Sequence, residues 1–75
     1  MEPTDLSFFV KEKRKLIKIT QPELADKAGV GLRFVRDLEQ GKTTLRMDKV
    51  NDVLALFGYE LGPTAINRDK LLNNE

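Results

Sequence analysis

Apolar residues recur along the chain at intervals of three and four, and they almost nowhere alternate with polar ones. This period belongs to the α-helix, which buries one apolar stripe against its neighbours. We expect helices from Leu6 to Ile17, from the cap Thr20 to Gly29, from Leu32 to Gln40 and from Met47 to Phe57. The pattern therefore predicts an all-α fold of four helices.

The residues at the expected helix ends support these limits. Thr20 is a good N-cap, and Glu23 follows it at the spacing of a capping box. Thr4 or Asp5 can cap the first helix in the same way. Gly29 can end the second helix, which is short. Because so short a helix does not persist alone, it must pack against its neighbours.

Composition excludes several classes of chemistry. The chain has 75 residues, which is enough for one domain with a small core. It contains no cysteine and no histidine, so disulfides, thiolate metal sites, ordinary zinc chemistry and imidazole catalysis are absent. Ser7 is the only serine, and no nucleophile with a neighbouring base is apparent. We expect no enzyme, no cofactor and no small-molecule substrate.

No segment of the sequence is suited to a membrane. The longest uninterrupted apolar stretch, Val53 to Phe57, is far too short to span a bilayer. The first four residues do not resemble the start of a signal peptide. We therefore expect a cytoplasmic protein with no membrane partner.

The net charge of +1, from 13 basic and 12 acidic residues, favours no partner by itself. The distribution of charge is more informative, because a group of basic side chains falls in the middle third of the chain while acidic ones are spread along it. These basic residues are Lys27, Arg33, Arg36, Lys42 and Arg46. The total charge would conceal a basic face of this kind.

Within residues 20–41, small and apolar residues stand at the offsets of a helix-turn-helix. Ala25 is small, as it must be where the second helix of the pair crosses close over the first. Gly29 can take the left-handed conformation that turns the chain. Val30, Val35 and Leu38 can then hold the second helix on the core.

The run from Ile19 to Val30, followed by Val35, Leu38-Glu39 and Gly41-Lys42-Thr43, resembles the helix-turn-helix of the phage-repressor superfamily, the Cro/C1 or XRE type. The resemblance covers residues 6–58. It implies a compact four-helix domain, similar to that of lambda repressor, over residues 1–58. In such proteins the second helix of the pair enters the major groove of double-stranded DNA, and the first lies across the backbone.

The resemblance also implies which residues face the DNA bases. They are Gly31, Leu32, Arg33, Arg36 and Asp37. Each arginine can donate hydrogen bonds to O6 and N7 of a guanine at the same time, although either arginine could instead be an ordinary solvated charge. Leu32 is unusual at its position, where it contacts a thymine methyl group or simply packs at the start of the helix. Asp37 accepts a bond from cytosine or, as we favour, holds one of the arginines.

A second group of residues is expected on the DNA phosphates, where contacts set register and affinity rather than sequence preference. It comprises Thr20, Gln21, Lys27, Lys42, Thr43, Thr44 and Arg46. Gln21 is placed for this role because it begins a helix, whose dipole favours an anion.

Two further features, an ion pair and a helix end, concern the fold. In phage repressors an arginine seven residues before the leading glutamine pairs with a glutamate, which makes Arg14 and Glu39 a structural ion pair here. Lys18 departs from the family, which often has glycine at that position. Lysine with a positive φ is mildly strained, so one expectation is that the first helix ends differently in this chain.

Residues 32–63 resemble the HipB-type antitoxins of HipBA toxin–antitoxin systems. The resemblance implies a short strand at residues 59–63 that pairs with its copy in a homodimer, because so short a strand cannot stand alone. The implied dimer interface consists of Phe57, Tyr59, Glu60, Leu61 and Gly62. Residues 64–75 are expected to form a mobile tail.

The implied function is a dimeric repressor of its own operon, which binds an inverted repeat and a HipA-like serine/threonine kinase. Two alternatives remain. One is a stand-alone regulator, such as a phage repressor or a restriction–modification controller. The other is a protein-interaction module that no longer binds DNA, which Arg33, Arg36 and Lys42 disfavour.

Overall fold

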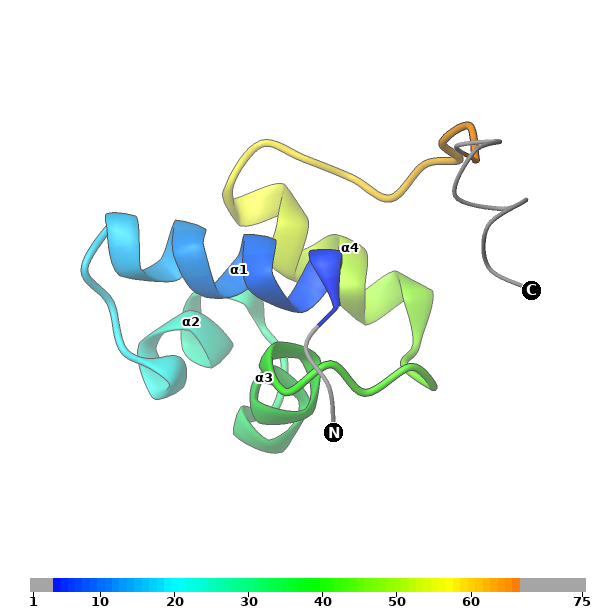
Figure 1. The fold of residues 1–75 in the computed structure, drawn as a ribbon. Coiled ribbons are helices and arrows are strands. Elements are labelled where there is room, and N and C mark those ends of the chain that lie inside the picture. Colours follow the sequence, from blue (N-terminus) through cyan, green and yellow to red (C-terminus); the bar gives the residue numbers. More distant parts are fainter. Residues whose placement is uncertain (1–3, 67–75) are drawn as a thin grey trace.

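Four helices account for most of residues 4–66, the part of the chain that the computed structural model describes (Figure 1). They are α1 (Asp5–Leu16), α2 (Gln21–Ala28), α3 (Leu32–Glu39) and α4 (Met47–Leu56). In Figure 1, α1 crosses the middle of the molecule, with α2 and α3 below it. Helix α3 packs on α1 and α2, and α2 also packs on α4. The predicted all-α fold and its helix-turn-helix pair are confirmed.

Capping boxes begin the first two helices. Thr4 and Ser7 exchange bonds at the start of α1, where the Thr4 amide donates to Ser7 Oγ (2.7 Å) and the Ser7 amide to Thr4 Oγ1 (3.1 Å). Of the two caps considered for this helix, Thr4 is therefore the one used. Thr20 and Glu23 form the predicted box of α2, with bonds of 3.2 and 2.9 Å.

A single apolar core joins the four helices. It consists of Val10, Leu24, Ala25, Val35, Leu38, Val50, Val53 and Leu54. The side chain of Ile17, the residue at which the first helix was expected to end, is 49% exposed. Helix α1 ends one residue earlier, at Leu16, so Ile17 already lies in the turn. In residues 4–66, no helix has both the length and the apolar content to cross a membrane.

Gly29 makes the turn between α2 and α3. It has φ 72° and ψ 32°, the left-handed conformation, and the next amide, of Val30, bonds back to the carbonyl of Ala25 at 3.0 Å. A Cβ at Gly29 would meet no other atom within 4 Å. Glycine is thus favoured here by the backbone conformation rather than by lack of space.

Lys18 takes the left-handed conformation that glycine would take more easily. Its φ is 59°, and the amide of Ile19 bonds back to the carbonyl of Arg14 at 3.3 Å. This is the arrangement of a glycine-type helix end. The expectation that α1 would end differently was therefore wrong, because the turn keeps its geometry and the lysine bears the strain.

We expect Lys18→Gly to raise the free energy of unfolding by about 0.5 to 1 kcal/mol, since relief of the left-handed strain exceeds the extra entropy of an unfolded glycine. Chemical denaturation followed by circular dichroism measures this difference. The control is Lys15→Gly, an exposed position inside α1, where glycine should cost up to about 1 kcal/mol. Equal destabilisation by both changes would contradict the strain at Lys18.

The segment after α4 packs back on helices of the same chain. The ring of Tyr59 lies edge-on against Phe9 of α1, with centroids 4.8 Å apart, and the Leu61 amide donates to Asn51 Oδ1 of α4 at 2.7 Å. Lys13 Nζ lies 5.4 Å from both aromatic centroids.

The strand expected at residues 59–63 is not present, and residues 4–66 contain no strand. Two contacts explain this conformation of the single chain: the Leu61 amide is already bonded to Asn51, and the Tyr59 ring is held by α1. Of the tail expected at residues 64–75, residues 67–75 lie outside the described part of the chain.

Candidate nucleic-acid interface

Helix α3 presents one apolar face to the core and one basic face to solvent. Val35 and Leu38 are buried, whereas Arg33 and Arg36 are exposed. Within residues 4–66, no side-chain hydrogen bond or ion pair holds either guanidinium group. Both guanidinium groups are therefore free to bind a partner that approaches the outer face of α3.

Asp37 pairs with a lysine rather than with an arginine. Its Oδ2 lies 3.6 Å from Lys42 Nζ, and the two side chains are 23% and 42% exposed. The role that we favoured for Asp37, to hold Arg33 or Arg36, is thus not the one that the structure gives it. The pair instead ties the last turn of α3 to the loop that follows.

The start of α3 is uncovered. Gly31 is its N-cap, with no side-chain capping bond, φ −74° and ψ 152°. Any residue could adopt this conformation, and a Cβ at Gly31 would meet nothing within 4 Å. The fold does not require glycine here, but its absence of a side chain lets another molecule approach the first amides of α3. Leu32 packs partly against the core, which is the structural role considered for it.

The start of α2 offers few free donors. The Thr20 amide donates to Glu23 Oε1, and the Glu23 amide donates to Thr20 Oγ1. Pro22 has no amide hydrogen. Gln21 is therefore the one residue of this first turn whose amide is unoccupied in the described chain, and its side-chain Nε2 donates to Glu39 Oε1 at 3.1 Å.

The capping carboxylate of α2 is held in its charged form. The backbone bond from Thr20, helped by the Thr20 hydroxyl, lowers the pKa of Glu23 below its ordinary value. A lowered pKa in the folded state stabilises the protein above the unfolded-state pKa, and this contribution is lost as the pH falls through the folded-state pKa.

We therefore expect the stability of the wild-type protein to fall more steeply below about pH 5 than that of Glu23→Gln. The glutamine keeps an oxygen for the Thr20 amide at every pH, whereas the glutamate loses its charge. Urea unfolding at a series of pH values measures both curves. Parallel curves would show that the Glu23 carboxylate does not contribute in this way.

Arg14 and Glu39 form the predicted ion pair. Arg14 Nε lies 2.7 Å from Glu39 Oε2, Nη2 lies 3.0 Å from Oε1, and Nη1 donates to the carbonyl of Ile19 at 2.9 Å. Glu39 is 4% exposed. The hydrogen bonding to Glu39 raises the pKa of the Arg14 guanidinium, despite its partial desolvation. The pair is bidentate and joins α1 to α3, which is a structural role.

The loop after α3 carries the other residues expected on phosphates. Lys42, Thr43, Thr44 and Arg46 are all exposed, as is Lys27 on α2. Arg46 bonds the Asp48 carboxylate at 2.7 and 3.2 Å, and this contact raises the pKa of Arg46. Lys42 and Arg46 therefore each lie beside a carboxylate. A phosphate that approaches either cation must share that cation with the carboxylate or displace the carboxylate.

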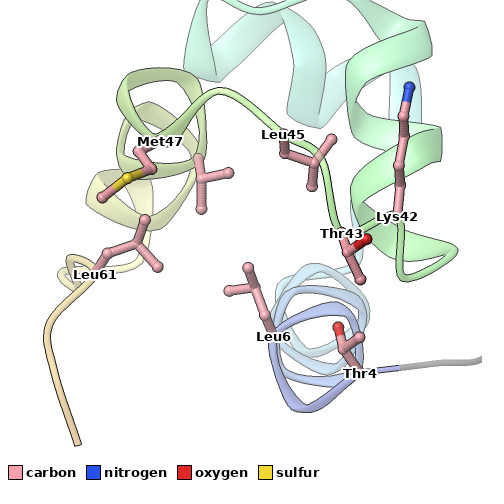
Figure 2. A pocket seen from close by; sticks show the side chains of 8 residues that line it. Thr4, Leu6, Lys42, Thr43, Leu45, Met47 and Leu61 are labelled. Atoms are coloured by element: carbon pink, nitrogen blue, oxygen red, sulfur yellow. The ribbon is translucent and has the colours of Figure 1, made fainter.

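An apolar pocket of about 280 Å³ lies beneath this loop (Figure 2). It is lined by Thr4, Leu6, Lys42, Thr43, Leu45, Met47, Val50 and Leu61. In Figure 2 the amino group of Lys42 points away from the space between Leu6 and Leu61. The pocket contains no acid–base pair. Within residues 4–66, no group of three or more acidic side chains could hold a metal ion.

Sequence reasoning missed two features of this surface. Gln40 is exposed at the end of α3, seven residues after Arg33, so helical spacing alone could have added it to the candidates. The bond between Gln21 and Glu39 joins residues 18 apart and has no local sequence signal.

Comparison with known proteins agrees with this geometry. A family model described as helix-turn-helix matches residues 10–67. A protein of Sinorhizobium fredii, named uncharacterized HTH-type transcriptional regulator y4mF, is 48% identical over 59 residues, which make up 79% of this chain and 78% of that protein.

Proposed function

Since the chain belongs to the Cro/C1-type (XRE) family of helix-turn-helix transcriptional regulators, which bind DNA, we propose that it is a sequence-specific repressor that inserts α3 into the major groove. The observation that carries this proposal is the pair of unengaged guanidinium groups on the outer face of α3. On that face, Arg33 and Arg36 read guanines through O6 and N7.

The remaining positions of the α3 surface determine how the helix fits into the major groove. Gly31 lets the helix start approach the DNA closely, since no side chain covers it. The exposed part of Leu32 contacts a thymine methyl group, and Gln40 extends the base-facing row. Asp37 acts through its pair with Lys42 rather than on a base.

Phosphate contacts on both sides of α3 set the register. On one side Gln21 donates from the start of α2, together with the Thr20 hydroxyl and Lys27. On the other side the loop supplies Lys42, Thr43, Thr44 and Arg46. The cationic members of this set make binding dependent on salt.

The repressor acts as a homodimer on an inverted repeat. Its interface consists of Phe57, Tyr59, Glu60, Leu61 and Gly62. The support is that two large apolar side chains of this region remain exposed, Tyr59 at 49% and Leu56 at 39%. In the dimer, residues 59–63 pair as a strand, for which the Leu61 amide leaves Asn51. A chain truncated after Gly58 should then sediment as a monomer, and a tight dimer would refute this interface.

The finer proposal is that the regulator is the antitoxin of a HipBA-type operon and binds a HipA-like kinase. Its support is the likeness of residues 32–63 to that class of antitoxin. A kinase reading frame beside the gene, with a kinase that co-purifies with this chain, is the expected result. An adjoining gene of another class would favour a stand-alone phage-type or restriction–modification regulator.

A mobility-shift titration tests DNA binding itself. The probe is the DNA upstream of the protein's own gene, compared with unrelated DNA at several salt concentrations. We expect a preference for the upstream DNA and a steep decrease in affinity with salt, because several cations neutralise phosphates. Indifference to sequence together with a flat response to salt would favour a protein-interaction module instead.

A further inference from the structure

The carboxylate of Glu39 serves two partners at once. Its Oε1 accepts bonds from Arg14 Nη2 (3.0 Å) and from Gln21 Nε2 (3.1 Å), while its Oε2 accepts the bond from Arg14 Nε (2.7 Å). The Glu39 side chain is 1% exposed, and the bidentate guanidinium fixes its position. It is therefore an immobile acceptor that reaches the start of α2.

This acceptor determines which way the Gln21 carboxamide points. An ionised carboxylate only accepts hydrogen bonds, so Gln21 must present its NH₂ group rather than its carbonyl oxygen. One hydrogen of Nε2 is then directed to Glu39, and the second remains free beside the start of α2. Without Glu39, either end of the carboxamide could face that position.

The second hydrogen belongs to the same residue as the one amide of this turn that is unoccupied within residues 4–66. Pro22 supplies no donor, and the amides of Thr20 and Glu23 are used within the capping box. Within residues 4–66, the nitrogen donors left at this helix start are thus the backbone N–H and the free Nε2–H of a single residue, Gln21. Two donors from one residue suit one phosphate, which the positive end of the helix dipole also favours.

We propose that Glu39 is a positioning residue for DNA binding, which holds the Gln21 carboxamide so that Gln21 donates twice to one backbone phosphate. This rests on the proposed function, in which Gln21 contacts DNA. The buried ion pair thereby links the stability of the α1–α3 contact to the register of the protein on its operator.

The experiment uses operator DNA in which single phosphates are replaced, one at a time, by neutral methylphosphonates. Where the wild-type protein contacts a phosphate, replacement of that phosphate weakens its binding. We expect a phosphate whose replacement costs the wild type about tenfold in affinity, as loss of bonds to a charged group would. Gln21→Ala keeps the backbone N–H but loses the Nε2–H, so it should show a clearly smaller difference between the two forms of that DNA.

The positioning role is tested with Arg14→Met/Glu39→Leu, which removes the acceptor and retains Gln21. This double variant should show the same reduced sensitivity as Gln21→Ala, because the backbone N–H is then the one donor that is still held in place. The matched control is Lys42→Ala, which should keep the wild-type sensitivity at this phosphate and lose it at another. A purely structural role of Glu39 would lower affinity without changing which phosphate matters.

Several results would overturn the proposal. One is full sensitivity at that phosphate in the double variant, and another is full sensitivity in Gln21→Ala. Failure of the wild type to bind operator DNA would instead refute the proposed function. If the double variant does not fold, the nitrogen-15 relaxation of the Gln21 side chain in the free wild-type protein tests whether the carboxamide is held in place. An order parameter close to that of rigid backbone, about 0.85, would support a held carboxamide, and a value below about 0.6 would refute it.

Discussion

Replacement of Glu39 alone by leucine is expected to lower the free energy of unfolding by about 3 to 5 kcal/mol, because it leaves the partly buried Arg14 guanidinium without its carboxylate. Arg14 now donates to Glu39 through two nitrogens and is only 14% exposed. The whole free energy of unfolding of a small domain is only roughly 5 to 15 kcal/mol, so this variant should be severely destabilised. Urea denaturation followed by circular dichroism measures the change.

The double variant Arg14→Met/Glu39→Leu should be much less affected, within about 2 kcal/mol of the wild type, since it leaves no unpaired charge. The double variant still loses two hydrogen bonds, to the Ile19 carbonyl and from Gln21 Nε2. Both of these groups can bind water instead. A double variant as unstable as Glu39→Leu would mean that the damage does not come from the orphaned charge.

Arg33→Ala is expected to weaken binding to the operator by about 1 to 3 kcal/mol and to relax base preference at one position of each half-site. The Arg33 guanidinium has no partner within residues 4–66, so its removal should not disturb the fold. Binding to a set of operators, each with one base pair changed, measures the preference. Arg33→Lys is a useful comparison, because it keeps the charge but not the bidentate geometry.

Lys42→Ala is the control for this prediction. It should weaken binding to all sequences by a similar factor and reduce the dependence on salt, as loss of a phosphate contact does. Its pair with Asp37 is long, at 3.6 Å, and both side chains reach solvent, so stability should change little. If Lys42→Ala and Arg33→Ala behaved alike, the division between base-reading and phosphate-binding residues would be refuted.

The fold was largely predictable because its signals are local. The box of Thr20 and Glu23, the left-handed Gly29 and the stripe of Val35 and Leu38 each depend on a few neighbouring residues. The ion pair of Arg14 and Glu39 is not local, and its confirmed prediction came from likeness to a family.

The errors arose where one interaction overrode another. At Lys18 the geometry of the turn prevailed over the preference of the residue, which propensity alone does not reveal. At residues 59–63 the single chain has contacts of Tyr59 and Leu61 with their own chain in place of the expected strand, whose pairing in a dimer stays a prediction. Gln21 was placed correctly at a helix start, but its bond to Glu39 depends on tertiary packing.

The central claim is that α3 reads the major groove, and substitution of single guanines by 7-deazaguanine tests it most directly. This base keeps its pairing and its minor-groove edge but lacks the N7 acceptor of the major groove. We predict one guanine in each half-site whose substitution weakens the wild-type protein and leaves Arg33→Ala unaffected. If no guanine behaves in this way and affinity responds only to changes in the minor groove, α3 is not the reading helix.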